Sequence, residues 1–254
     1  MKITILGSGT SQGIPVIACD CHVCTSTDIR DNRLRCSVLI EYEGENYVID
    51  AGPDFRQQLL RANVKSLRAV LFTHEHKDHI AGLDDVRAFN FRENRDMEIY
   101  CTLQVEEALH REYHYAFDKA PYPGVPELNV NIINLDPFVL PNGLNVIPVE
   151  VMHHKMAVLG FRFGKFAYVT DAKTVEESEI EKLKGVEILI INALRKEPHI
   201  SHFNLEEALD FIEKVNPKAA YLTHISHLFG THLEIERELP PRVHVAYDGL
   251  QFEF

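Results

Sequence analysis

A short histidine-rich segment constrains this chain more than any other feature. It spans residues 73–79, reads Thr-His-Glu-His-Lys-Asp-His, and follows an apolar run at 69–72. The apolar run predicts a buried strand, and a loop at its carboxyl end would project the polar side chains together. In extended chain His74 and His76 can point the same way and share one metal ion. Asp78 and His79 follow the turn and can reach a second ion, so the segment predicts a dinuclear metal site.

A merely polar loop is the alternative interpretation of this segment. Four potential ligands in so short a stretch would each need their own solvation or burial, and neighbouring protonated histidines would repel one another. A shared cation removes both difficulties. We therefore favour the metal site over the polar loop.

Length and composition predict one domain over residues 1–254. Hydrophobic residues make up 45% of the chain and charged residues 25%, the usual mixture for a globular protein with a substantial core. The apolar run at the amino terminus ends at Gly7, too early for a signal or membrane segment. We expect a cytoplasmic protein with no membrane contact.

The net charge of -12 bears on the substrate class. An acidic surface disfavours binding along extended nucleic acid, because the phosphate backbone needs a broad basic footprint. Bound metal cations and local basic groups can still attract a small anion. A small anionic substrate is therefore expected rather than a polymer.

Three of the five cysteines lie together at Cys19, Cys21 and Cys24, within a loop at about 13–36. An odd count with such close spacing does not suit a disulfide framework, whereas three thiolates can surround a tetrahedral Zn²⁺ if a fourth ligand arrives. That ligand must come from elsewhere in the chain or from His22. The alternative is that these cysteines are small buried residues. Cys36 and Cys101 stand alone and are expected in the core.

Hydrophobic patterning predicts an α+β chain in which strands and helices are mixed. Helices are expected at 54–62, 103–113, 174–184 and 204–214, the last with Asn204 as its N-cap. Strands are expected at 2–6, 37–42, 46–50, 69–72, 98–101, 130–134, 144–152, 158–163, 166–170, 187–191, 218–222, 243–247 and 250–254. This order suits two sheets packed face to face with helices outside.

Three further candidate ligands follow predicted strands. They are the His153-His154 pair, Asp171 and His224. The end of a rigid strand holds a metal ligand more accurately than mobile chain does. Asp50, after another strand, could orient a ligand imidazole or stabilise a turn.

These motifs resemble those of the metallo-β-lactamase superfamily, whose members are mostly hydrolases. The resemblance implies an αββα sandwich. It also implies that His74, His76 and one of the 153/154 pair bind the first metal. Asp78, His79 and His224 would bind the second, with Asp171 bridging. We favour His154, because the residues after it resemble the family's short loop and glycine-aromatic strand.

A closer resemblance is to the PhnP group of phosphodiesterases, which act on phosphoribosyl cyclic phosphate. It rests on residues 9–16, the cysteine triplet and residues 222–227, and it covers nearly the whole chain. It implies a structural zinc held by Cys19, Cys21, Cys24 and His227. It also implies a general acid at His202 and, from the family, a homodimer. For His202, as for nearby His199, an exposed polar role is the alternative.

The predicted function is metal-dependent hydrolysis of a small phosphodiester, including a cyclic ribosyl phosphate. Two divalent ions, Zn²⁺ or Mn²⁺, would activate a water, with Asp78 and His202 as the catalytic residues. A tRNA 3′-processing nuclease and a non-catalytic metal-binding regulator are the alternatives. The sequence does not assign the phosphate-binding side chains, for which Lys155, Lys173, Arg195 and Lys196 are candidates. Residues 113–124 predict either a lid or packed irregular chain.

Overall fold

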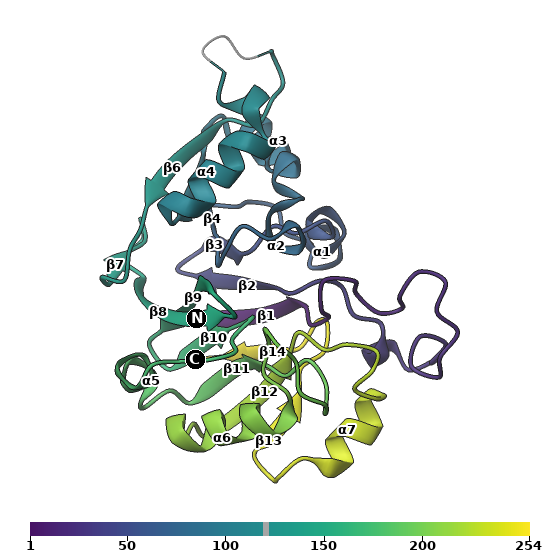
Figure 1. Cartoon of the computed structure of the whole chain (residues 1–254). Coiled ribbons are helices and arrows are strands. Elements are labelled where there is room, and N and C mark those ends of the chain that lie inside the picture. Colours follow the sequence, from purple (N-terminus) through teal and green to yellow (C-terminus); the bar gives the residue numbers. More distant parts are fainter. Residues whose placement is uncertain (119–121) are drawn as a thin grey trace.

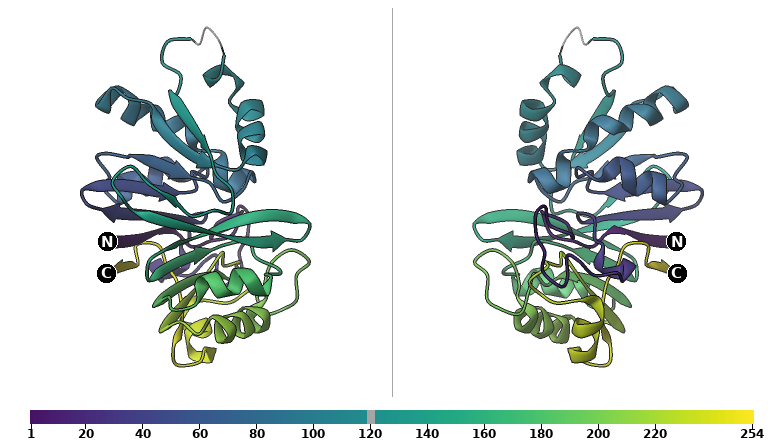
Figure 2. Two further views of the ribbon diagram at one scale, coloured as in Figure 1. Left: turned by 90° about the vertical axis from the view of Figure 1, so that its left-hand side faces the viewer. Right: turned by 90° about the vertical axis from the view of Figure 1, so that its right-hand side faces the viewer.

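Two mixed sheets pack face to face, and helices cover both outer faces (Figure 1). The computed structural model describes residues 1–118 and 122–254. Figure 2 shows the same layers from two sides, with the chain ends next to each other. The ends meet because β1 (Lys2–Gly7) pairs antiparallel with β14 (Gln251–Glu253). The predicted αββα sandwich is confirmed.

The first sheet has seven strands in the order β14-β1-β2-β3-β4-β5-β6. Its remaining strands are β2 (Ser37–Tyr42), β3 (Glu45–Ile49), β4 (Ala69–Leu71), β5 (Met97–Cys101) and β6 (Leu128–Ile132). Four helices lie on its outer side: α1 (Phe55–Arg61), α2 (Lys77–Ile80), α3 (Arg87–Glu93) and α4 (Leu103–Glu112).

The second sheet also has seven strands, in the order β13-β12-β11-β10-β9-β8-β7. They are β7 (Phe138–Val139), β8 (Asn145–His153), β9 (Met156–Phe163), β10 (Phe166–Val169), β11 (Ile188–Asn192), β12 (Ala219–Thr223) and β13 (Val243–Val245). Its outer helices are α5 (Glu177–Leu183), α6 (Leu205–Val215) and α7 (His232–Glu238).

The core has three apolar layers, one between the sheets and one under each set of helices. Side chains from both sheets, among them Ile40, Phe161 and Tyr168, fill the central layer. The α6 helix begins as predicted: Asn204 accepts a hydrogen bond from the Glu207 amide, and the Glu207 side chain accepts one from the Asn204 amide. This reciprocal capping satisfies two amide groups at the helix start.

The direction of the parallel strands determines where the donor residues lie. In the first sheet β3, β4, β5 and β6 run parallel, and in the second β10, β11, β12 and β13 do. Parallel strands end at one edge of their sheet, and the loops after them carry ligands in open α/β sheets. The segments after β3, β4, β10 and β12 therefore become neighbours.

The structure differs from the predicted elements mainly in its short pieces. The helices α2, α3 and α7 and the strand β7 were not predicted; α2 has four residues and β7 two, which is too short for a clear hydrophobic period. α5 begins at Glu177 rather than at residue 174, since the backbone of Thr174 pairs instead with Met152. Within residues 1–118 and 122–254, every helix is too short or too polar to cross a bilayer.

Candidate metal centre

Imidazole and carboxylate donors from four segments meet where the two sheets end. His74 follows β4, His79 lies in α2, Asp171 follows β10 and His224 follows β12. Donor atoms lie within 4.8 Å of one another in each of three groups: His74, His79 and Asp171; Asp78, His79 and His224; and His153, Asp171 and His202. The structure thus brings together residues that are as far apart in the sequence as His74 and His224.

Two buried ring nitrogens in this cluster have no hydrogen-bond partner among the residues that the structure describes. They are Nε2 of His74 and Nε2 of His79. Oxygens of Asp78 and Asp171 lie 3.2 and 3.4 Å from His79 Nε2 without forming hydrogen bonds. An unsatisfied buried polar atom is costly, and in a native protein it calls for an explanation such as an ion. A set of imidazole and carboxylate donors suits Zn²⁺, Mn²⁺ or iron, so the residues fit a metal.

Asp50 orients both of these histidines from behind. Its Oδ2 lies 2.7 Å from Nδ1 of His79 and 2.9 Å from the Thr73 hydroxyl, which in turn lies 2.9 Å from Nδ1 of His74. The Thr73 amide also donates to Asp50. With Nδ1 of each ring held in this way, Nε2 points into the cluster. Such outer contacts fix the tautomer and direction of metal-binding histidines.

A threonine precedes each of three strand-end donors, which the sequence reasoning did not single out. Thr73, Thr170 and Thr223 stand directly before His74, Asp171 and His224, and all three are buried. The Thr170 hydroxyl donates to Asp171 Oδ2 at 2.6 Å, whereas the Thr223 hydroxyl lies 3.4 Å from the Cys36 thiol, its one hydrogen-bond partner within the described part of the chain. A threonine directly before each of these donors is a pattern that could have been found in the sequence.

The structure corrects the choice within the 153/154 pair. His153 is buried, belongs to the donor group with Asp171 and lies 5.1 Å from the ring of His76. Its Nδ1 donates to the carbonyl of Ser201, at 2.8 Å, which leaves Nε2 for a ligand. His154 is exposed and occupies the turn between β8 and β9 with φ 57. The prediction of His154 was wrong, because the strand continues through His153 and turns one residue later.

The electrostatics of the cluster favour a bound cation. Burial raises the pKa of Asp171, but the positive charge of His224 and His79 outweighs it and holds that pKa well below its usual range. Burial lowers the pKa of His224 to about 4. At His79 burial also lowers the pKa, but the carboxylates of Asp50, Asp78 and Asp171 raise it well above normal. This concentration of negative charge attracts positive charge to one point.

His202 lies beside Asp171 and His224 of the cluster. Its Nε2 is 3.0 Å from Asp171 Oδ1, and its ring stacks on His224 with centroids 4.8 Å apart. Its other nitrogen contacts the Ser201 hydroxyl at 3.1 Å and His199 Nδ1 at 3.2 Å. The predicted acid therefore sits beside the donors, while His199 lies behind it.

The cysteine loop forms a second group of potential ligands. The sulfur atoms of Cys19, Cys21 and Cys24 lie 3.3, 3.5 and 3.5 Å from Nδ1 of His227. His22 points elsewhere and pairs with Glu234. A hydrogen bond from the Cys24 amide lowers the pKa of Cys21 to about 6, and burial raises that of Cys24 to about 11. Three sulfurs and one imidazole nitrogen are a donor set for tetrahedral zinc.

This second group is joined to the first through the backbone. Ile225, next to His224, donates to the Ser8 carbonyl and accepts from the Thr10 amide, both at 3.0 Å. His227 follows two residues later. The segment that leads into the cysteine loop is therefore hydrogen-bonded to the segment that holds a metal-centre donor.

One of the candidate phosphate-binding residues lines a cleft beside the cluster. Lys155 lines it together with His76, His153 and Gln104. The other three candidates are engaged elsewhere: Lys173 pairs with Glu207, Lys196 pairs with Glu238, and Arg195 donates to backbone carbonyls. Lys155 is the candidate that faces the site.

Residues 113–124 were predicted to form either a lid or packed irregular chain. Tyr113 and Tyr115 of this segment contact α2 and the turn after it. The Tyr113 hydroxyl donates to the Ile80 carbonyl at 2.7 Å, and that of Tyr115 donates to Asp84 at 2.6 Å. These contacts favour packed chain. Residues 119–121 of this prediction lie outside the described residues.

Comparisons with known proteins agree with this geometry. The family model described as β-lactamase superfamily domain matches residues 45–225. The crystal structure of a diphosphatase from the PhnP family has a TM-score of 0.93 and 39% identity, covering 100% of this chain and 96% of that one. Zinc-bound PqqB from Methylobacterium extorquens has a TM-score of 0.80 at 19% identity, covering 100% of both chains, and so shares the fold.

One relative carries a different kind of name. A Porphyromonas gingivalis protein named octanoyltransferase is 42% identical over 99% of this chain, but the chain spans only 51% of that protein's length. A transferase name does not agree with the hydrolase pattern, and about half of that protein has no counterpart in this chain. The match over residues 45–225, the fold and the donor cluster give one consistent result: the chain belongs to the β-lactamase superfamily.

Proposed function

We propose that this chain is a phosphodiesterase that cleaves a small phosphodiester, such as a cyclic phosphate on a ribosyl group. The observation that carries the proposal is the donor cluster with His202 beside it, its Nε2 3.0 Å from Asp171 Oδ1. The similar PhnP-family structure, itself named a diphosphatase, supports phosphoryl chemistry. That name also makes a diphosphate linkage the second candidate substrate.

The donors divide between two metal positions. His74, His76 and His153 would hold one ion, and Asp78, His79 and His224 the other, with Asp171 between them. Divalent ions bound there would lower the pKa of a water to give the nucleophile and would neutralise phosphoryl oxygens. Asp50 and Thr73 keep the His74 and His79 rings aimed inward throughout.

His202 has the position of a general acid for the leaving group. Asp171 Oδ1 accepts a hydrogen bond from its Nε2, which keeps a proton on the nitrogen that faces the cluster. A leaving alkoxide is a strong base and departs more readily when it receives a proton. The Ser201 hydroxyl and His199 at Nδ1 hold the ring in this orientation.

The alternatives of a tRNA nuclease and a regulator have less support. The short form of human tRNase Z shares the fold, with a TM-score of 0.71 at 18% identity. A net charge of -12 disfavours a long nucleic-acid substrate. A metal-binding regulator that has lost turnover would use the donor set but would have no use for an acid beside it.

Metal-dependent turnover with an Asp78→Ala control tests the proposed function. Protein stripped with a chelator and reloaded with Mn²⁺ or Zn²⁺ should hydrolyse bis-p-nitrophenyl phosphate and a ribose cyclic phosphate. The Asp78→Ala variant should be inactive, because a ligand to one ion is lost. Asp210→Ala, an exposed carboxylate on α6, should behave as wild type. Release of p-nitrophenolate and phosphate-monoester product is measured.

Two results would contradict this proposal. Absence of turnover on every phosphodiester by fully metal-loaded protein would favour the regulator. Turnover restricted to diphosphate linkages would favour the second candidate substrate.

Replacing His202 by alanine should have an effect that depends on the leaving group. For an alkoxide such as a ribose oxygen we expect a loss in kcat of about 10²–10⁴. For p-nitrophenolate, which leaves without a proton, the loss should be under about tenfold. Metal content should not change. A variant that loses metal, or loses both activities equally, would show that His202 is a ligand rather than the acid.

Replacing Thr73 by valine should weaken metal binding without altering the ligands themselves. Valine has the same shape but cannot connect Asp50 to His74, so we expect a loss in affinity of about 10–100-fold. Competition with a chromophoric chelator measures it. Thr223→Val is the matched control, because this buried strand-end hydroxyl contacts Cys36 and no donor. Equal losses in the two variants would point to general destabilisation.

We also propose that Cys19, Cys21, Cys24 and His227 hold one structural zinc. Cys21→Ser should lose a zinc equivalent by elemental analysis, and activity should fall as the segment carrying His224 loosens. Cys101→Ser, a buried cysteine far from the loop in sequence, provides the control for packing. A Cys21→Ser protein with unchanged zinc content and activity would refute the assignment.

A further inference from the structure

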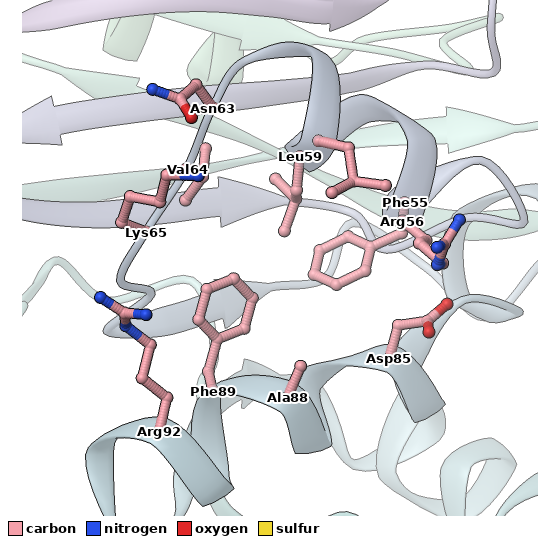
Figure 3. Close-up of a pocket in the computed structure, with 11 residues that line it drawn as sticks. Phe55, Arg56, Leu59, Asn63, Val64, Lys65, Asp85, Ala88, Phe89 and Arg92 are labelled. Atoms are coloured by element: carbon pink, nitrogen blue, oxygen red, sulfur yellow. The ribbon is translucent and has the colours of Figure 1, made fainter.

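A cavity of about 390 Å³ lies between α1 and α3, outside the metal centre. In Figure 3 the side chains of Phe55 and Leu59 from α1 face Phe89 from α3 across it. Phe55 and Leu59 are buried and are 1% and 5% exposed. Cavities of this size with apolar walls are typical of small-molecule sites, which span roughly 300–1,000 Å³.

Cations surround this apolar space. Lys65 and Arg92 lie at one end of the cavity, and Arg56 lies near Asp85 at the other (Figure 3). The neighbours of Arg92 along the chain are paired, Arg87 with Asp84 and Arg95 with Glu93. Among residues 1–118 and 122–254, Lys65 and Arg92 have no ion-pair partner, and both side chains are exposed. Lys65 and Arg92 therefore place two positive charges at one end of the apolar space.

We propose that this cavity binds a medium-chain fatty carboxylate, with the alkyl chain between the two helices and the carboxylate at Lys65 and Arg92. A guanidinium binds a carboxylate through two parallel hydrogen bonds, and an ammonium adds a point charge. The aromatic and aliphatic walls take up methylene groups. Charge complementarity at one end and apolar walls along the length select an occupant with one anionic head and one apolar tail.

The apolar walls predict how affinity depends on chain length. Each methylene transferred from water into the cavity should tighten binding roughly fourfold until the space is full. Hexanoate, octanoate and decanoate should therefore form a steep series. Decanol lacks the charge and decyltrimethylammonium reverses it, so both should bind at least about tenfold more weakly than decanoate.

Isothermal titration calorimetry on the metal-loaded full chain, below the micelle concentration of each ligand, measures this series. The same titration on chelator-treated protein is the control, because a carboxylate bound at the metal centre would need the ions. The affinity for decanoate should be the same with and without metal ions. Loss of binding on removal of the metal would place the carboxylate on the metal centre and would overturn the proposal.

Three variants locate the site. Lys65→Gln and Arg92→Gln should each weaken decanoate binding about tenfold, because each loses a charged contact to the head group. Ala88→Phe should abolish binding by filling the cavity while leaving every charge in place; Ala88 is exposed, which favours folding of this variant. Arg237→Gln, on the exposed surface of α7, is the matched control and should bind as wild type.

Three results would contradict the proposal. Decanol binding as tightly as decanoate would mean an apolar pocket without head-group recognition. Unchanged affinity in Ala88→Phe, with its fold verified by circular dichroism, would mean that the fatty acid binds elsewhere. Loss of affinity in Arg237→Gln equal to that in Arg92→Gln would mean unspecific attraction to surface charge.

Discussion

The contact between the Asp50 carboxylate and Nδ1 of His79, at 2.7 Å and shielded from solvent on both sides, is the interaction on which the metal centre depends. A buried carboxylate is costly unless hydrogen bonds and charge compensate it. Here the Thr73 amide and hydroxyl and the His79 ring supply that compensation. Because one carboxylate serves two histidines, His74 and His79 are oriented together and their free nitrogens converge.

This arrangement needs two sheets that cannot shift relative to each other. The sheets are connected by backbone hydrogen bonds near the site as well as by the apolar layer between them. The Leu159 amide in β9 donates to the Thr73 carbonyl after β4, at 3.0 Å. On the other side, Ile225 exchanges hydrogen bonds with Ser8 and Thr10. The donors of both sheets thus belong to one hydrogen-bonded frame, which suits ligands that must stay within a fraction of an ångström.

Most of this site followed from the sequence, because metal donors stand directly after apolar strands and their chemistry is conspicuous. Long elements were predictable for the same reason, whereas α2, with four residues, has no period to detect. The prediction of His154 as the ligand was wrong because the strand continues through His153 and His154 lies in the following turn. Alternation was informative there: Val149 and Val151 are buried, so His153 two residues on shares their face. The cavity beside α1 was not predictable, since its walls come from helices that periodicity alone did not bring together.

Backbone strain at the strand ends shows how strongly the surrounding structure determines the site. Asp50, Asp171 and His224 have φ of 63, 58 and 58, in the left-handed region that residues with a side chain seldom adopt. Each such residue costs on the order of 1–3 kcal/mol, and strain of this kind persists only where other contacts impose it. The left-handed residue turns the chain sharply at the end of its strand. The strain is therefore located at the points where it sets the direction of the orienting carboxylate and of two donors.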